Sequence, residues 1–202
     1  MQIENHKEEV PFAHYEELFK ALVPAEAVSR TNVKWDGNEF YVNLLGREYA
    51  ISHPDYALRP LDGGALPPLP VQTFLLRYLL ESKDVAWCGL WKTFREMPWG
   101  EMYIQPYTGR VLTRAAYTFG FRLAAFKAAA EKMGAMPVPH GDAGFEFPLI
   151  GNFKMRFLVW EGDDEFPPSA QVLYSDNFAE GFAAEDRVVA GDILITTIKA
   201  NM

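Results

Sequence analysis

Residues 145–177, FEFPLIGNFKMRFLVWEGDDEFPPSAQVLYSDN, decide the fold of this chain. Phe145–Ile150 and Lys154–Trp160 are apolar runs of strand length, and the Gly151-Asn152 pair between them predicts a tight turn. A charged, proline-containing loop then leads to Ala170–Tyr174, which predicts one more short strand. We therefore expect consecutive strands here to form part of an antiparallel sheet.

The chain before this stretch begins with a helix and continues with strands. Apolar residues at helical spacing predict a helix over Phe12–Leu22, which Pro24 ends, and a short second turn follows at Ala25–Arg30. Two-residue periodicity then predicts a three-stranded meander over Val33–Trp35, Phe40–Leu44 and Glu48–Ser52. We expect Gly46 at the first central position of a type II′ turn in this meander.

The remaining segments alternate between loop and helix. The proline-rich segment His53–Pro70 predicts a long connecting loop, and Val71–Leu80 predicts an enclosed helix. A longer helix is expected over Thr113–Met133, capped by Thr113 and ended by Gly134. Glu185–Ala200 predicts a C-terminal helix.

These patterns together predict one α+β domain that spans residues 1–202. We expect an antiparallel sheet of about five or six strands. The helices beginning at Val71 and Thr113 would pack on one face of the sheet, and the terminal helices would lie at its edges.

The composition indicates a globular protein and narrows the classes of partner. The formal net charge of -8 opposes binding to nucleic acid and to anionic membranes. Cys88 is the one cysteine, and its apolar neighbours predict a buried thiol in a reducing compartment. The N-terminus lacks a basic region followed by an apolar run, so the sequence predicts a cytoplasmic protein.

No motif of a well-known catalytic class is present. The chain lacks a P-loop, a GxGxxG fingerprint, a GxSxG elbow, an HExxH helix and paired CxxC motifs. The order His140-Gly141-Asp142 also differs from the Asp-x-His-x-x-Gly order of cobalamin-binding folds. The sequence therefore identifies no cofactor, and it leaves open whether the protein is an enzyme.

The acidic stretch Glu161, Asp163, Asp164 and Glu165 has two interpretations. Several carboxylates in one loop suit a hard cation such as Ca²⁺ or Mg²⁺, although the spacing is not that of an EF-hand. Acids that follow a strand are more often a solvated turn in which a carboxylate accepts backbone N–H groups. His140 and Asp142, two residues apart, are further candidate metal ligands.

A second group of candidates lies in the aromatic segment Trp87–Gly109. Aromatic density of this kind seals a core edge or lines a ligand pocket. Within it, Trp91, Arg95 and Glu96 could hold a polar ligand. The competing interpretation is structural, with the Arg95 guanidinium paired to Asp163, Asp164 or Glu165.

Three stretches together carry a resemblance to a known family. Residues 90–103, LWKTFREMPWGEMY, residues 160–177 and a closing helix after residues 184–187, AEDR, make the chain resemble a bacterial family known only as a domain of unknown function. The resemblance spans most of the chain and implies a protein common in anaerobes. The resemblance also implies that some relatives are fused to a small iron–sulfur cluster domain, which suggests a role in redox or corrinoid metabolism.

These observations lead to two hypotheses about function. The first is a non-enzymatic accessory or ligand-binding protein whose partner is a small molecule or an iron–sulfur or corrinoid protein. The alternative is a metal-assisted hydrolase that uses the acidic loop 161–165 with His140 and Asp142.

Overall fold

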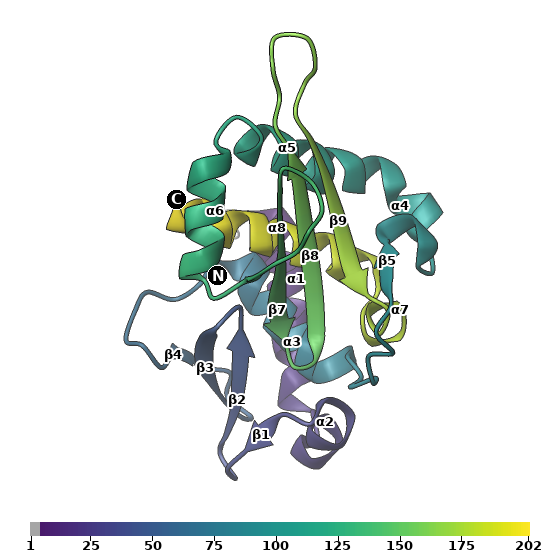
Figure 1. Ribbon diagram of the computed structural model, residues 1–202. Coiled ribbons are helices and arrows are strands. Elements are labelled where there is room, and N and C mark those ends of the chain that lie inside the picture. Colours follow the sequence, from purple (N-terminus) through teal and green to yellow (C-terminus); the bar gives the residue numbers. More distant parts are fainter. Residues whose placement is uncertain (1–4) are drawn as a thin grey trace. The chain divides into compact units, whose positions relative to one another are not determined.

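The computed structural model describes residues 5–202, which divide into two compact units at Asp84 and Val85 (Figure 1). Each unit has its own helices and antiparallel strands. The prediction that residues 1–202 form one domain stays a prediction, and residues 1–4 lie outside the described residues.

The first unit combines three helices with a small sheet. Its elements are α1 (His6–Lys20), α2 (Pro24–Thr31), β1 (Lys34–Trp35), β2 (Glu39–Leu44), β3 (Arg47–Ser52), β4 (Leu58–Pro60) and α3 (Leu69–Glu81). The four strands pair antiparallel in the order β1-β2-β3-β4, and α1 packs against α3. The predicted helices and the meander are therefore confirmed.

The turn between β2 and β3 differs from the expected type. Leu44 pairs with Arg47, so the two central residues are Leu45 and Gly46, with φ of 52° and 82°. Positive φ at both positions defines a type I′ turn, with Gly46 second rather than first. The prediction of a type II′ turn was wrong because the strand β3 begins one residue earlier than its pattern indicated.

The proline-rich segment is also more ordered than a loop. The short strand β4 lies within the segment predicted as a connecting loop, and it pairs with β3 through Leu58 and Ile51. Pro60 is tolerated there because, among residues 5–202, β4 pairs with β3 only and its other edge needs no donor.

The second unit holds the longer strands and most of the helices. Its elements are β5 (Trp91–Thr93), η1 (Phe94–Glu96), α4 (Gly100–Tyr107), the π-helical turn η2 (Thr108–Thr113), α5 (Arg114–Phe119), α6 (Leu123–Lys132), β6 (Met136–Pro137), β7 (Ala143–Ile150), β8 (Phe153–Trp160), β9 (Ser169–Ser175), α7 (Phe178–Gly181) and α8 (Ala184–Asn201). The strands pair antiparallel in the order β6-β7-β8-β9-β5. In Figure 1, β7, β8 and β9 are the long green arrows.

The alternation along β8 sorts its side chains onto two faces of this sheet. Phe153, Met155 and Phe157 are buried, whereas Lys154 and Arg156 between them are partly exposed. The buried side packs against α5, and the neighbouring strands contact α6 and η2. Each fully buried phenylalanine contributes about 1.5–3 kcal/mol to folding through the hydrophobic effect.

The expected helix Thr113–Met133 is two helices separated by residues 120–122. A Cβ at Gly120 would overlap the Pro168 side chain and lie 2.7 Å from the Ala116 carbonyl oxygen. The β8–β9 loop therefore approaches the chain closely where α5 ends, and this approach requires a glycine. Thr113 has helical φ and ψ and makes no cap, so that part of the prediction was wrong as well.

Two further expectations change. Helix α8 is not peripheral, because it packs against α4, α5, α6 and η2, and its Gly191 lies beside Val111 and Tyr174. Residues 5–202 contain nine strands rather than about five or six. The three strands that were not predicted, β4, β5 and β6, have two or three residues each, too few to show a period in the sequence.

Two smaller findings concern exposure and hydropathy. Cys88 is exposed rather than buried, because it lies in the irregular segment before β5. Within residues 5–202, none of the helices combines the length and the apolar character that crossing a bilayer requires.

Candidate functional site

Trp91, one of the predicted site residues, lies on the sheet face opposite the helices of the second unit. Its ring lies under the Arg156 guanidinium, 4.0 Å from the ring centroid. The Trp87 and Trp91 rings pack edge to face with their centroids 5.4 Å apart. The Lys154 ammonium lies over the Trp87 ring, 4.6 Å from its centroid. The two indoles therefore cover two cations that alternate along β8.

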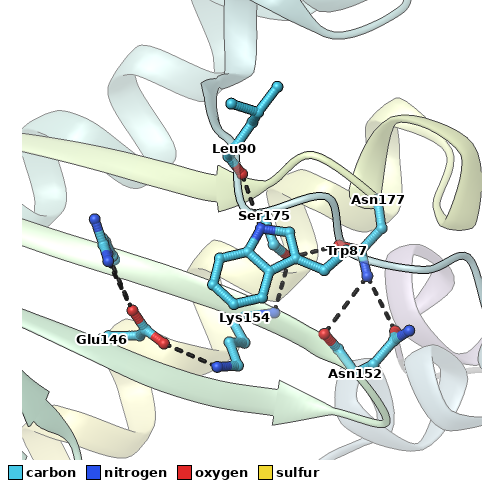
Figure 2. A network of polar contacts seen from close by, with 8 residues as sticks. Trp87, Leu90, Glu146, Asn152, Lys154, Ser175 and Asn177 are labelled. Carbon is cyan, nitrogen blue, oxygen red and sulfur yellow. Dashed lines mark hydrogen bonds and ion pairs between the residues drawn. The ribbon is translucent and has the colours of Figure 1, made fainter.

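A buried carboxylate holds both cations in place. Glu146 on β7 is 4% exposed and accepts hydrogen bonds from Lys154 Nζ at 3.0 Å and Arg156 Nη2 at 2.9 Å. Figure 2 shows Lys154 extended toward Glu146 beside the Trp87 ring. With one negative and two positive charges, the cluster has a net charge of +1 if all three groups are ionised.

The segment that carries Trp87 is tied to the sheet by amide side chains (Figure 2). Asn152 Nδ2 donates to the Val85 carbonyl oxygen at 2.8 Å, and Asn177 Nδ2 donates to the same oxygen at 3.1 Å. Ser175 Oγ in turn donates to Asn177 Oδ1 at 2.6 Å. These bonds fix the segment against the ends of β8 and β9, so the indole of Trp87 has a defined place over Lys154.

Glu96 accepts hydrogen bonds from Thr93 within its own turn. Its Oε2 accepts hydrogen bonds from the Thr93 backbone N–H and the Thr93 hydroxyl, both at 2.7 Å. The hydrogen bond from the Thr93 side chain, followed by the one from the backbone, lowers the pKa of Glu96 below its usual value of 4.5. This is a capping box at the start of η1, so Glu96 has a structural role.

Arg95 does not pair with the acidic stretch, contrary to the structural interpretation of the sequence. It forms an ion pair with Glu101 instead, with Nε 3.4 Å from Oε1, and both side chains are largely exposed. Thr93 pairs with Leu173, four residues along β9 from Ser169 and the acidic loop. At about 3.3 Å per residue, the loop is roughly 13 Å too far along the sheet.

The acidic stretch forms the loop between β8 and β9. Asp163 Oδ1 accepts the backbone N–H groups of Glu165 at 2.9 Å and Phe166 at 2.7 Å, and these bonds lower the pKa of Asp163. Asp164 and Glu165 are exposed. Asp163 therefore stabilises the turn through its own backbone contacts.

The metal-site candidates are not gathered. Asp142 Oδ2 accepts the Glu161 backbone N–H at 2.8 Å, which links the β6–β7 connection to the end of β8. Between residues 5 and 202, no three His, Cys, Asp or Glu side chains are grouped closely enough to hold a metal ion. Asp142 thus contacts the acidic stretch through a hydrogen bond from the backbone of Glu161.

A cavity of about 260 Å³ lies where β5 ends beside β9. It combines polar and apolar walls from five elements: Thr93, Phe94, Arg95, Ile104, Tyr107, Thr108, Leu112, Gln171 and Val172. Of the residues predicted from the aromatic segment, it includes Arg95, whereas Trp91 and Glu96 are outside its lining. A pocket with mainly apolar walls and a few polar groups is the usual form of a small-ligand site.

The apolar wall of the cavity is rigidly packed. The Phe94 and Tyr107 rings are stacked at 4.0 Å, and Tyr174 lies 6.4 Å from Tyr107. Burial raises the pKa of both tyrosines, and so their hydroxyls stay protonated at neutral pH. Arg187 on α8 holds the adjoining turn, because its Nη1 donates to the Pro98 carbonyl oxygen at 2.9 Å.

Sequence reasoning missed the charged cluster and most of the cavity. Lys154 and Arg156 stand at alternate positions of a strand, which marks a polar face but no partner. Glu146 gave a clearer signal, since a carboxylate inside an apolar strand is almost always paired. Tyr107 belongs to the aromatic segment that was a candidate pocket lining, whereas Ile104, Thr108 and Leu112 gave no signal, because the helix α4 and the turn η2 were not predicted.

Neither the curated proteins nor the solved structures include a match to this chain. A family model does match, over residues 23–197. This range contains residues 90–103, 160–177 and 184–187, at the three stretches that carried the resemblance. The chain belongs to the family described as Domain of unknown function (DUF3786).

Proposed function

We propose that this protein is a non-enzymatic accessory protein that binds a ligand in the cavity between β9 and α4. One observation carries the proposal: a cavity with mainly apolar walls and with four polar residues in its lining, Thr93, Arg95, Thr108 and Gln171. Polar groups at a few points of an apolar wall orient a ligand, and the apolar remainder supplies burial.

The charge of Arg95 favours an anionic group on the ligand. Its pair with Glu101 is exposed on both sides, and such surface pairs contribute about 0–1 kcal/mol. A carboxylate in the cavity can therefore compete with Glu101 at little cost.

The proposal also includes the cellular location and the partner that the resemblance implies. The protein would act in the cytoplasm of an anaerobe, with an iron–sulfur or corrinoid protein as partner. The resemblance of residues 90–103 and 160–177 supports this setting. A cluster would be bound by the partner, since this chain has the single cysteine Cys88.

No comparable observation favours metal-assisted hydrolysis. The carboxylates of Asp142 and Asp163 each accept a hydrogen bond from a backbone N–H, and neither residue lines the cavity. We therefore propose no second function.

The test uses three probes of similar size and different charge: benzoate, benzamide and benzylamine. We expect benzoate to shift the amide resonances of Thr93, Thr108 and Gln171 in NMR spectra at lower concentration than benzamide, and benzylamine to have the weakest effect. The order follows from the attraction between Arg95 and a carboxylate.

Two variants of α4 make the test specific to the cavity. Ile104→Trp fills the cavity and should abolish the benzoate shifts, whereas Met102→Trp changes an outward side chain that is 72% exposed and should preserve them. Benzoate shifts that persist in Ile104→Trp, or that never occur at the lining residues, would overturn the proposal.

A further inference from the structure

Strand β9 has an edge that its neighbour covers only in part. β5 pairs with Leu173–Ser175, whereas β9 continues back to Ser169. β8 covers the opposite edge from Tyr174 to Ser169, which pairs with Trp160. Across residues 5–202, no strand pairs with the β5 side of Ser169–Val172.

The hydrogen-bond alternation tells which backbone groups face this open edge. The Asp176 N–H donates to the Leu90 carbonyl oxygen, so even-numbered residues of β9 direct their backbone groups toward the β5 side. Ala170 is such a residue and is partly exposed. Its N–H and C=O are therefore placed to pair with an added strand.

The cavity lies between this edge and a helix. Gln171 and Val172 form its strand wall, and Ile104, Tyr107, Thr108 and Leu112 from α4 and η2 form the opposite wall. A groove between a strand edge and a helix is a shape that binds extended peptides, because the strand supplies backbone hydrogen bonds and the helix supplies side-chain contacts.

An added strand could not run past Val172. The next position along the edge belongs to Thr93, and the turn η1 that follows it supplies Phe94 and Arg95 to the cavity lining. A peptide on this edge must therefore end at the cavity.

Arg95 determines which end of a peptide the cavity favours. It lines the closed end of the groove, whereas its partner Glu101 does not line the cavity. A guanidinium binds a terminal carboxylate with two parallel hydrogen bonds and repels a terminal ammonium.

We propose that the cavity binds the C-terminal end of an extended peptide, with the terminal carboxylate on Arg95 and an apolar last residue inside. The preceding residues run parallel to β9 and pair with the backbone of Ala170. This inference rests on the proposed function, since it names the ligand class of the same site.

The experiment uses the whole chain and three tetrapeptides of the sequence Thr-Val-Thr-Val. The first is N-acetylated with a free carboxylate, the second is N-acetylated with a terminal amide, and the third has a free amine and a terminal amide. We expect calorimetric titration to give the free carboxylate at least about tenfold tighter binding than either amide, the usual effect of a charged hydrogen bond.

Protein variants test the role of Arg95. In Arg95→Gln, the carboxylate peptide should bind no more tightly than the amide peptide. Arg122→Gln removes an equal charge at an exposed position outside the cavity and should keep the preference. An unchanged preference in Arg95→Gln would overturn the inference, as would tighter binding of the free-amine peptide.

An N-methylated peptide tests whether backbone hydrogen bonds to β9 contribute to binding. Methylation of the three amide nitrogens between residues of the carboxylate peptide removes three of its four backbone donors and should weaken binding about tenfold. An unweakened methylated peptide would mean that the strand edge takes no part, contrary to the proposal.

The two proposals fail in different ways. If benzoate shifts the lining resonances and the carboxylate peptide does not bind, the peptide inference is wrong and the ligand-binding proposal stands. If neither probe binds, both are wrong.

Discussion

The guanidinium of Arg156 lies 4.0 Å from the centroid of the Trp91 ring. Trp91 is on β5 and Arg156 is on β8, so β9 separates the two strands that carry them. Contact across an intervening strand requires long side chains on the same face of the sheet. The pair therefore reports directly on the order of these three strands.

A double-mutant cycle should detect this contact. Trp91→Leu and Arg156→Met remove the two partners while keeping apolar bulk, and we expect a coupling energy of about 0.5–2 kcal/mol. Urea unfolding of the four proteins measures it. Additive effects of the two substitutions would contradict the contact.

Removal of Glu146 should destabilise the protein more than removal of an ordinary surface acid. Glu146→Gln leaves Lys154 and Arg156 without their carboxylate, and both cations are partly exposed, with 30% and 23% of the side chain accessible. We expect a loss of about 1–3 kcal/mol, less than for a fully buried pair.

The matched control for Glu146 is Glu131→Gln, at an exposed position of α6. Its effect on the free energy of unfolding should stay within about 0.5 kcal/mol. Equal losses in the two variants would show that the buried cluster contributes no more than a surface charge.

Glu96 should contribute to the pH dependence of stability. Its pKa is lowered in the folded protein, first by the Thr93 side-chain hydrogen bond, so its contribution is present above the usual value of 4.5. That contribution is lost as the pH falls through the folded pKa. The stability difference between wild type and Glu96→Gln should therefore shrink on acidification.

The measurement is the free energy of unfolding at neutral pH and at several values well below 4.5. Glu131→Gln provides the baseline for loss of one exposed carboxylate. A difference for Glu96→Gln that stays constant, or grows, as the pH is lowered would contradict the capping role.

Two glycines of neighbouring helical segments should respond to alanine in opposite ways. Gly120→Ala places a Cβ against Pro168 and 2.7 Å from the Ala116 carbonyl oxygen, which should cost about 1–3 kcal/mol. At Gly109 the added Cβ meets nothing within 4 Å, so Gly109→Ala should stabilise by about 0.4–1 kcal/mol. Thermal unfolding of both variants checks the two signs.

The sequence predicted elements well where a period was long enough to read. The alternation Phe153, Lys154, Met155, Arg156 marked β8, and its neighbours β7 and β9 were also found. Strands of two or three residues, such as β5, gave no period. The helix end at Gly120 was missed, and Pro168, which packs against this glycine, is distant in sequence.

The candidate site was predicted less well than the fold. Arg95 does line the cavity, but its expected partners lie at the other end of β9. Glu96 was a candidate for ligand binding or ion pairing and instead accepts local hydrogen bonds from Thr93, whereas Asp163 accepts backbone N–H groups as the turn interpretation of the acidic stretch predicted. Carboxylates in turns often bind nearby backbone donors, which a list of charged residues does not reveal.

The sequence by itself determined the local elements, the two-residue pattern of β8 and the acidic turn after it, because these depend on residues a few positions apart. Only the tertiary structure decided that Glu146 holds Lys154 and Arg156, that Trp91 covers Arg156 and that a cavity opens beside β9. Those contacts follow from strand register and strand order. Both are set by packing over the whole sheet, which no short stretch of sequence contains.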